Sequence, residues 1–175
     1  MGAILYVVDT LLWLALFVVM ARLLLQWTRA DFRNPLCQAV VRLTNPLILP
    51  LRRVLPPLGK IDTASVVAVF LVAIVKVGCF FALTEGLPPL AAWIRPVFME
   101  IARTLLWTYF YAIVLYALLS LIAPGGYSPL QSVLTSLCEP ALRPIRRIIP
   151  ALAGIDLSPL WACILIQAIL ILLRY

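Results

Sequence analysis

Four long apolar segments dominate the hydrophobic pattern of the chain. They cover residues 4–27, 63–83, 101–123 and 157–173. Each meets or nearly meets the roughly 17–25 residues that a helix needs to cross the hydrocarbon core of a membrane. The segments are apolar on all sides, whereas the helices of a soluble bundle keep a polar outer face. The pattern therefore predicts an all-α membrane protein with four transmembrane helices.

Composition and proline placement favour the same fold class over a buried soluble bundle. Hydrophobic residues make up 65% of the chain and charged residues 12%, against roughly 45–50% and 25% in soluble domains. Thirteen of the 14 prolines lie outside the four segments, and Pro159 falls in a first helical turn, where proline is tolerated. The first segment has no basic stretch before it and no small-residue cleavage site after it, so we interpret it as a retained helix.

Basic residues concentrate in two of the three connections, which predicts the topology. Residues 28–62 and 124–156 carry nine of the 14 basic residues, namely Arg29, Arg33, Arg42, Arg52, Arg53, Lys60, Arg143, Arg146 and Arg147. The positive-inside rule places both connections in the cytoplasm, with both termini and residues 84–100 on the outer side of the membrane. The net charge of +7 is then mainly a topology signal. Nucleic acid is not an expected partner, because the basic residues lack an aromatic-interleaved groove.

The two basic connections contain the same block of sequence. Residues 34–65 align without a gap to residues 128–159 at an offset of 94, and 11 of the 32 positions are identical. We expect a first repeat over residues 1–85, an outward-facing linker over 86–100 and a second repeat over 101–175. Each repeat crosses the membrane twice, so the copies are parallel and related by a pseudo-two-fold axis along the membrane normal.

Each copy of the block begins with a pattern typical of a capped helix. Asn34 and Ser128 precede a proline, which suits an N-cap followed by the first helical position. A narrow polar stripe follows at helical spacing: Gln38, Arg42 and Asn45 in the first copy, Ser132, Ser136 and Glu139 in the second. We expect Pro46 and Pro140 to end these short helices. They lie either on the membrane surface, apolar side down, or buried against the spans.

After the short helix, each copy has an arginine pair in a proline-bounded turn and an aspartate that opens the next span. These residues are Arg52, Arg53 and Asp62 in the first copy and Arg146, Arg147 and Asp156 in the second. The aspartates are expected N-caps, and the alternative is an Arg–Asp contact within each copy. The arginine pairs either anchor the topology or bind anionic lipid or phosphate, whose oxygens suit the guanidinium fork.

The doubled block resembles the bacterial YggT family. The resemblance rests on NPL…TNPLILPLRRVLPPLGKID, repeated as SPL…CEPALRPIRRIIPALAGID after PGGY, and covers nearly the whole chain. It implies a small integral membrane protein whose relatives are associated with osmotic tolerance, with membrane events near cell division and, in plastids, with assembly of a cytochrome's haem. It implies no catalytic residues that could be carried over to this sequence.

Charged residues inside the spans are the other candidates for function. Asp9 and Lys76 lie at similar predicted depths from the outer surface, so we predict that they pair. The alternative is that each reaches the outer interface alone. In the second copy, Arg103 and Leu170 occupy the matching positions.

The sequence gives little support to catalysis. It contains no histidine, and its four cysteines are scattered without a CxxC pair. We therefore expect a protein that is not an enzyme and that has no cofactor and no metal site. The favoured function is a membrane scaffold or assembly helper, with anionic lipids and membrane or cytoplasmic proteins as candidate partners. The alternative is an ion or solute conduit, for which an oligomer of the chain could supply the pore.

Overall fold

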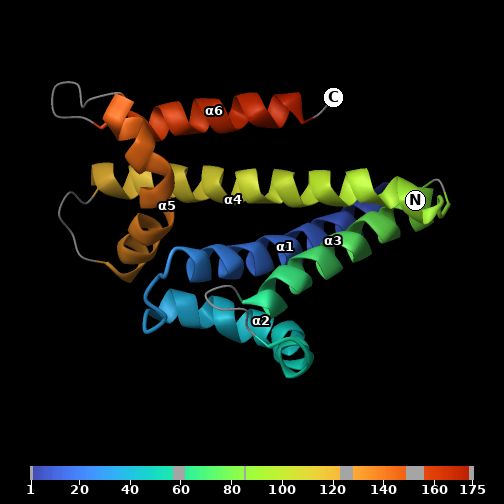
Figure 1. Cartoon of the computed structure of the whole chain (residues 1–175). Coiled ribbons are helices and arrows are strands. Elements are labelled where there is room, and N and C mark those ends of the chain that lie inside the picture. The colour runs from blue at the N-terminus through green and yellow to red at the C-terminus, as the bar shows by residue number, and fades with distance from the viewer. Residues whose placement is uncertain (1, 57–61, 85, 123–127, 149–155, 174–175) are drawn as a thin grey trace. The chain divides into compact units, whose positions relative to one another are not determined.

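The structure, a computed structural model, describes residues 2–56, 62–84, 86–122, 128–148 and 156–173. In this part of the chain all regular structure is helical (Figure 1). The helices are α1 (Gly2–Trp27), α2 (Pro35–Val54), α3 (Thr63–Thr84), the 3-10 helix η1 (Leu90–Trp93), α4 (Ile94–Ile122), α5 (Pro129–Ile148) and α6 (Ser158–Leu172).

Three of the helical stretches are long and apolar enough to cross a membrane. They are Gly2–Trp27, Thr63–Thr84 and Leu90–Ile122, with mean hydropathies of 2.3, 2.7 and 2.0. The fourth predicted span is also an apolar helix, but α6 has only 15 residues. The all-helical class and the membrane-like character predicted from the sequence are confirmed.

The chain divides into two compact units. Unit 1 contains Met1–Leu23 and Val40–Leu105, and unit 2 contains Leu24–Ala39 and Leu106–Tyr175. In unit 1 the buried positions of α3 recur every three to four residues, among them Ala64, Ala68 and Ala73, so one side of the helix faces the core. In unit 2, α5 packs against α6. The repeat boundaries predicted above concern sequence similarity rather than contacts, and they stay a prediction.

Helices α2 and α5 are longer than predicted. Pro46 and Pro140 do not end them, and both helices continue past a second proline four residues later to Val54 and Ile148. A proline removes one hydrogen bond and kinks the helix, and both helices bend along their length in Figure 1. Burial on both sides of the first proline keeps each helix intact. Thr44 and Ile48 flank Pro46, Cys138 and Leu142 flank Pro140, and all four are nearly or fully buried.

Residues 86–100, predicted as an outward-facing linker, contain the start of the next helix, and the side of a membrane that they face stays a prediction. Helix α4 begins at Ile94 rather than at residue 101, directly after η1. Pro96 falls in its first turn, where the missing N–H costs nothing. The polar residues Arg95 and Glu100 end the apolar segment but not the helix. Glu100 therefore lies on a helix in unit 1.

Candidate functional site

The two copies of the repeated block make the same ion pair. Arg52 Nη2 lies 2.6 Å from Asp62 Oδ2, and Arg146 Nε lies 2.8 Å from Asp156 Oδ2. The arginines lie in the last turns of α2 and α5, not in the turn between prolines that the sequence predicted. Each pair joins the end of the repeat helix to an aspartate just before the next apolar helix, one residue before α3 and two residues before α6. The Arg–Asp contact weighed above is thus present in both copies.

In the second copy the guanidinium of Arg146 donates hydrogen bonds to three acceptors. Besides Asp156, its Nη1 donates to Glu139 Oε2 at 2.8 Å and its Nη2 donates to Tyr116 Oη at 3.2 Å. Burial acts against the charge, but the hydrogen bonds to Asp156, Tyr116 and Glu139 outweigh it and raise the pKa of Arg146. All three guanidinium nitrogens therefore have a protein acceptor.

Asp156 is held ionised by the same contacts. Burial raises its pKa, but hydrogen bonds from Ser158 and from the Arg146 guanidinium outweigh this, so the pKa lies below its ordinary value. Its Oδ1 accepts the backbone N–H of Ser158, the first residue of α6, at 2.9 Å. The carboxylate thus receives a backbone hydrogen bond at the start of α6 and pairs with Arg146. The predicted Arg–Asp contact is therefore present, but the N-cap of α6 is Leu157, so the prediction of Asp156 as the cap residue was wrong by one position.

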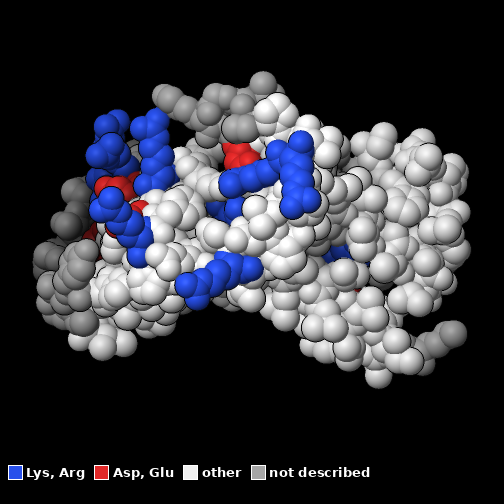
Figure 2. Space-filling view, turned by 90° about the horizontal axis from the view of Figure 1, so that it is seen from below, with Lys and Arg blue, Asp and Glu red and all other residues white. Residues whose placement is uncertain are grey.

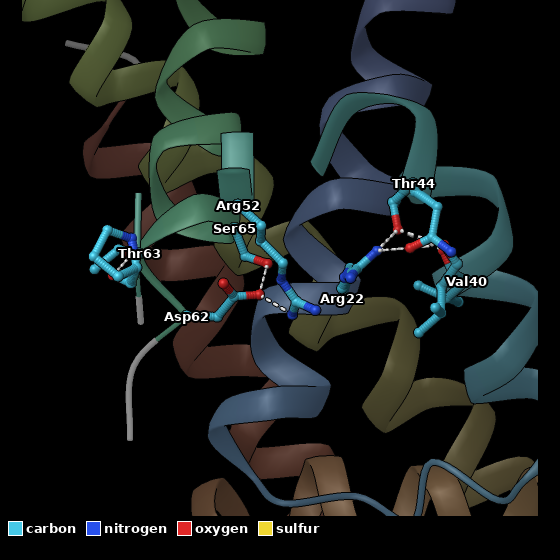
Figure 3. Close-up of polar contacts among 10 residues, drawn as sticks. Arg22, Val40, Thr44, Arg52, Asp62, Thr63 and Ser65 are labelled. Atoms are coloured by element: carbon cyan, nitrogen blue, oxygen red, sulfur yellow. Dashed lines mark hydrogen bonds and ion pairs between the residues drawn. The ribbon is translucent and has the colours of Figure 1, made fainter. Parts of the chain in front are cut away.

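In the first copy the corresponding region contains a buried arginine on α1. Arg22 is 2% exposed, and its Nη1 donates to Thr44 Oγ1 at 2.7 Å and to Asn45 Oδ1 at 3.0 Å. Figure 3 shows the Arg52–Asp62 pair on the other side of Arg22 from Thr44. Asp62 Oδ2 also accepts the Ser65 hydroxyl at 2.7 Å. Arg22 therefore fastens α2 to α1 beside the ion pair.

The caps predicted for the first residue of each repeat block are present at the starts of α2 and α5. Asn34 Oδ1 accepts the N–H of Leu36 at 2.9 Å, and Ser128 Oγ accepts the N–H of Gln131 at 3.1 Å. The side chain of Asn34 also donates to the Pro129 carbonyl at 2.7 Å. Within unit 2, the start of the first copy is thereby bonded to the start of the second.

The second arginine of each pair points to solvent. Arg53 and Arg147 are exposed, while their neighbours make the ion pairs. In Figure 2 the charged side chains form groups in which acidic and basic atoms lie together, on a surface that is otherwise mostly uncharged. Helix α2 contains no acidic residue and also exposes apolar side chains, including Leu43 at 72% and Val54 at 78%. Exposed apolar and basic residues on one helix are typical of membrane-surface segments.

A second cluster joins three apolar helices of unit 1. Lys76 Nζ on α3 lies 2.8 Å from Asp9 Oδ1 on α1 and 2.7 Å from Glu100 Oε1 on α4. The side chain of Lys76 is 11% exposed, that of Glu100 16% and that of Asp9 44%. The structure thus brings together Asp9 and Lys76, the two residues that the sequence analysis paired.

Sequence reasoning missed Glu100 because it placed residues 86–100 in a linker. The available signal was a lone carboxylate one residue before the apolar segment 101–123. A small cavity of about 10 Å³ lies beside Asp9 and Lys76, and it is otherwise lined by apolar residues and Cys79. This volume is about that of one water molecule. Among the described residues, no group of three or more metal-ligating side chains occurs.

Comparison with known proteins gives a single family. The family model described as CCB3/YggT matches residues 1–83 and again residues 96–175. The protein called "Uncharacterized protein YggT" in Escherichia coli strain K12 is 36% identical over 169 residues, which are 97% of this chain and 88% of that protein. "Uncharacterized protein PA0392" of Pseudomonas aeruginosa is 37% identical over 172 residues, covering 95% and 86%. No solved structure matches the chain.

Proposed function

The chain belongs to the CCB3/YggT family, and we propose that it is a multi-pass protein of the bacterial inner membrane. In this proposal it is not an enzyme and acts as a scaffold or assembly helper. Its working surfaces are the arginine-bearing ends of α2 and α5. The single observation that carries the proposal is the repeated Arg–Asp contact. It holds each arginine-bearing helix end at the start of an apolar helix and leaves Arg53 or Arg147 exposed for a partner.

The topology that goes with this function has four crossings. Helices α1, α3 and α4 have the length and hydropathy of spans. At about 1.5 Å per residue, the 15 residues of α6 extend about 22 Å, somewhat less than the roughly 30 Å hydrocarbon core. Local thinning of the bilayer compensates for such a shortfall. The excess of arginine on α2 and α5 favours the cytoplasmic side for both and the outside for both termini.

Crosslinking in intact cells tests the scaffold proposal. A photoreactive residue replaces Val54 or Ile148, the exposed apolar residue that follows each arginine pair. We expect defined crosslinked products that disappear when Arg53 and Arg147 are both changed to glutamate. These reversals leave the Arg52–Asp62 and Arg146–Asp156 pairs in place, so the fold is spared. Reversal of exposed Arg33, outside both helices, is the matched control and should leave the products unchanged.

The alternative function, an ion or solute conduit, is favoured by the cluster of Lys76, Asp9 and Glu100. Ionisable groups inside apolar helices are costly and are typical of ion and proton pathways. A water-sized cavity lies beside the cluster. Ion flux into liposomes containing the purified protein tests this alternative. Protein-dependent flux that is lost on Glu100→Gln, which leaves Lys76 paired with Asp9, would favour the conduit over the scaffold.

A further inference from the structure

Each copy of the repeat places a polar cluster at corresponding positions, but the two clusters differ in net charge. Each residue of the cluster in the second copy lies 94 positions after its counterpart in the first copy. The first node, as we name it, consists of Arg22, Asn45, Arg52 and Asp62, and the second node of Tyr116, Glu139, Arg146 and Asp156. With both acids ionised, the first node carries a net charge of +1 and the second a net charge of −1.

The second node is complete without a ligand. Arg146 is its only cation, and each of its three guanidinium nitrogens donates to a protein oxygen. Two of these acceptors are carboxylates, Glu139 and Asp156. An approaching anion would meet a surplus negative charge, and the two guanidinium N–H groups left over already lie beside these acceptors, so we infer that this node serves to hold α5 in place.

The first node has unused donors and a surplus cation. Among the described residues, Arg52 has one acceptor, Asp62 Oδ2, which it contacts through Nη2. Its side chain is 43% exposed, so its other nitrogens are open to a ligand. Arg22 stands where the second node has Tyr116 and adds a buried positive charge that interacts with Arg52. The neutral Asn45 stands where the second node has Glu139.

The surroundings of the first node fit a lipid better than a free ion. Exposed Leu43 and Val54 lie on the same helix as Arg52. In the second copy the counterpart of Leu43, Leu137, is 5% exposed, while Ile148, the counterpart of Val54, is as exposed as Val54. Exposed Arg53 adds a second guanidinium next to Arg52. Guanidinium forks match phosphate oxygens, and exposed apolar side chains elsewhere on the same helix can contact acyl chains.

We propose that the first node binds the phosphate of an anionic phospholipid headgroup through Arg52, supported by Arg53 and by the buried charge of Arg22, and that the second node does not. The proposal rests on the proposed function in one respect, that α2 lies at the membrane surface. It makes the two repeats unequal: the first copy holds lipid, while α5 of the second copy stays available to a protein partner.

Native mass spectrometry of the purified protein in detergent, titrated with phosphatidylglycerol or phosphatidylcholine, tests the proposal. Loss of a charged hydrogen bond predicts that Arg52→Gln lowers the affinity for phosphatidylglycerol roughly tenfold. The matched Arg146→Gln variant should bind it as the unchanged protein does. The double variant Arg22→Tyr/Asn45→Glu gives the first node the composition of the second, and it should lose affinity while keeping the Arg52–Asp62 pair.

Several outcomes would overturn the proposal. Equal loss in Arg52→Gln and Arg146→Gln would mean that charge alone, not the node, attracts lipid. Unchanged affinity in both Arg52→Gln and the double variant would exclude the site. Equal binding of phosphatidylcholine would remove the need for an anion, and displacement of lipid by millimolar inorganic phosphate would assign the node to free phosphate. Because no partner protein takes part, failure here leaves the crosslinking test of the scaffold unaffected, and failure of that test leaves lipid binding unaffected.

Discussion

Replacing Lys76 by methionine should destabilise the protein far more than removing either of its acidic partners. The methionine keeps the apolar bulk of the side chain but removes the charge between Asp9 and Glu100. Asp9 Oδ1 and Glu100 Oε1 each lie within 2.8 Å of Lys76 Nζ. These two oxygens are therefore no further apart than about twice that distance. At an effective dielectric constant near 20, two unit charges so placed repel by about 3 kcal/mol.

The same geometry predicts a milder effect for Glu100→Gln. Lys76 keeps its contact with Asp9, so the pair that remains is balanced, and the expected loss is roughly 1 kcal/mol. In a protein that already carries Lys76→Met, Glu100→Gln should be stabilising, because it removes one of two facing carboxylates. The change in sign is the clearest consequence of a lysine shared by two acids.

The free energy of unfolding, measured by denaturing the purified protein in mild detergent, checks both statements. Val75→Met, at an exposed neighbouring position on α3, is the control and should have little effect. A Lys76→Met variant no less stable than Glu100→Gln, or a double variant less stable than Lys76→Met alone, would refute the reasoning.

Three further predictions follow from single contacts. Gly78→Ala places a Cβ 2.8 Å from two ring carbons of Trp93, so we expect a loss of about 1–3 kcal/mol in unfolding free energy and a shifted Trp93 fluorescence; unchanged stability and fluorescence would contradict the packing. The lowered pKa of Asp156 stabilises the fold above the ordinary pKa of the group, and this contribution is lost as pH falls through the lowered value. Asp156→Asn should therefore cost about 1 kcal/mol at pH 7 and flatten the acid-unfolding curve; an unchanged curve would refute the assignment. Burial raises the pKa of Cys138 to about 12, so a maleimide at pH 8 should modify Cys138 only after unfolding; rapid labelling of the folded protein would show that α5 does not bury it.

The helices and caps were predictable because they follow from local patterns. Apolar runs, a capping residue before a proline and matching positions 94 residues apart are all visible in one sequence. The pairing of Asp9 with Lys76 followed from helix rise alone, since similar depth on neighbouring spans brings the side chains within reach.

The errors arose where tertiary contacts override a local rule. Proline usually ends a helix, yet α2 and α5 continue because buried residues lie on both sides of Pro46 and Pro140. The local sequence does not indicate that the residues around these prolines are buried. The partnership of Arg22 with Thr44 and Asn45 was equally hidden, because it depends on how α2 lies against α1.

The crosslinking of Val54 and Ile148 variants in intact cells tests the scaffold proposal most directly. The scaffold proposal predicts defined products at one or both positions, lost when Arg53 and Arg147 are changed to glutamate and retained in Glu100→Gln, which leaves Lys76 paired with Asp9. Products that survive the arginine reversals but vanish with Glu100→Gln would contradict it, and would place the working part of the molecule at the intramembrane cluster instead.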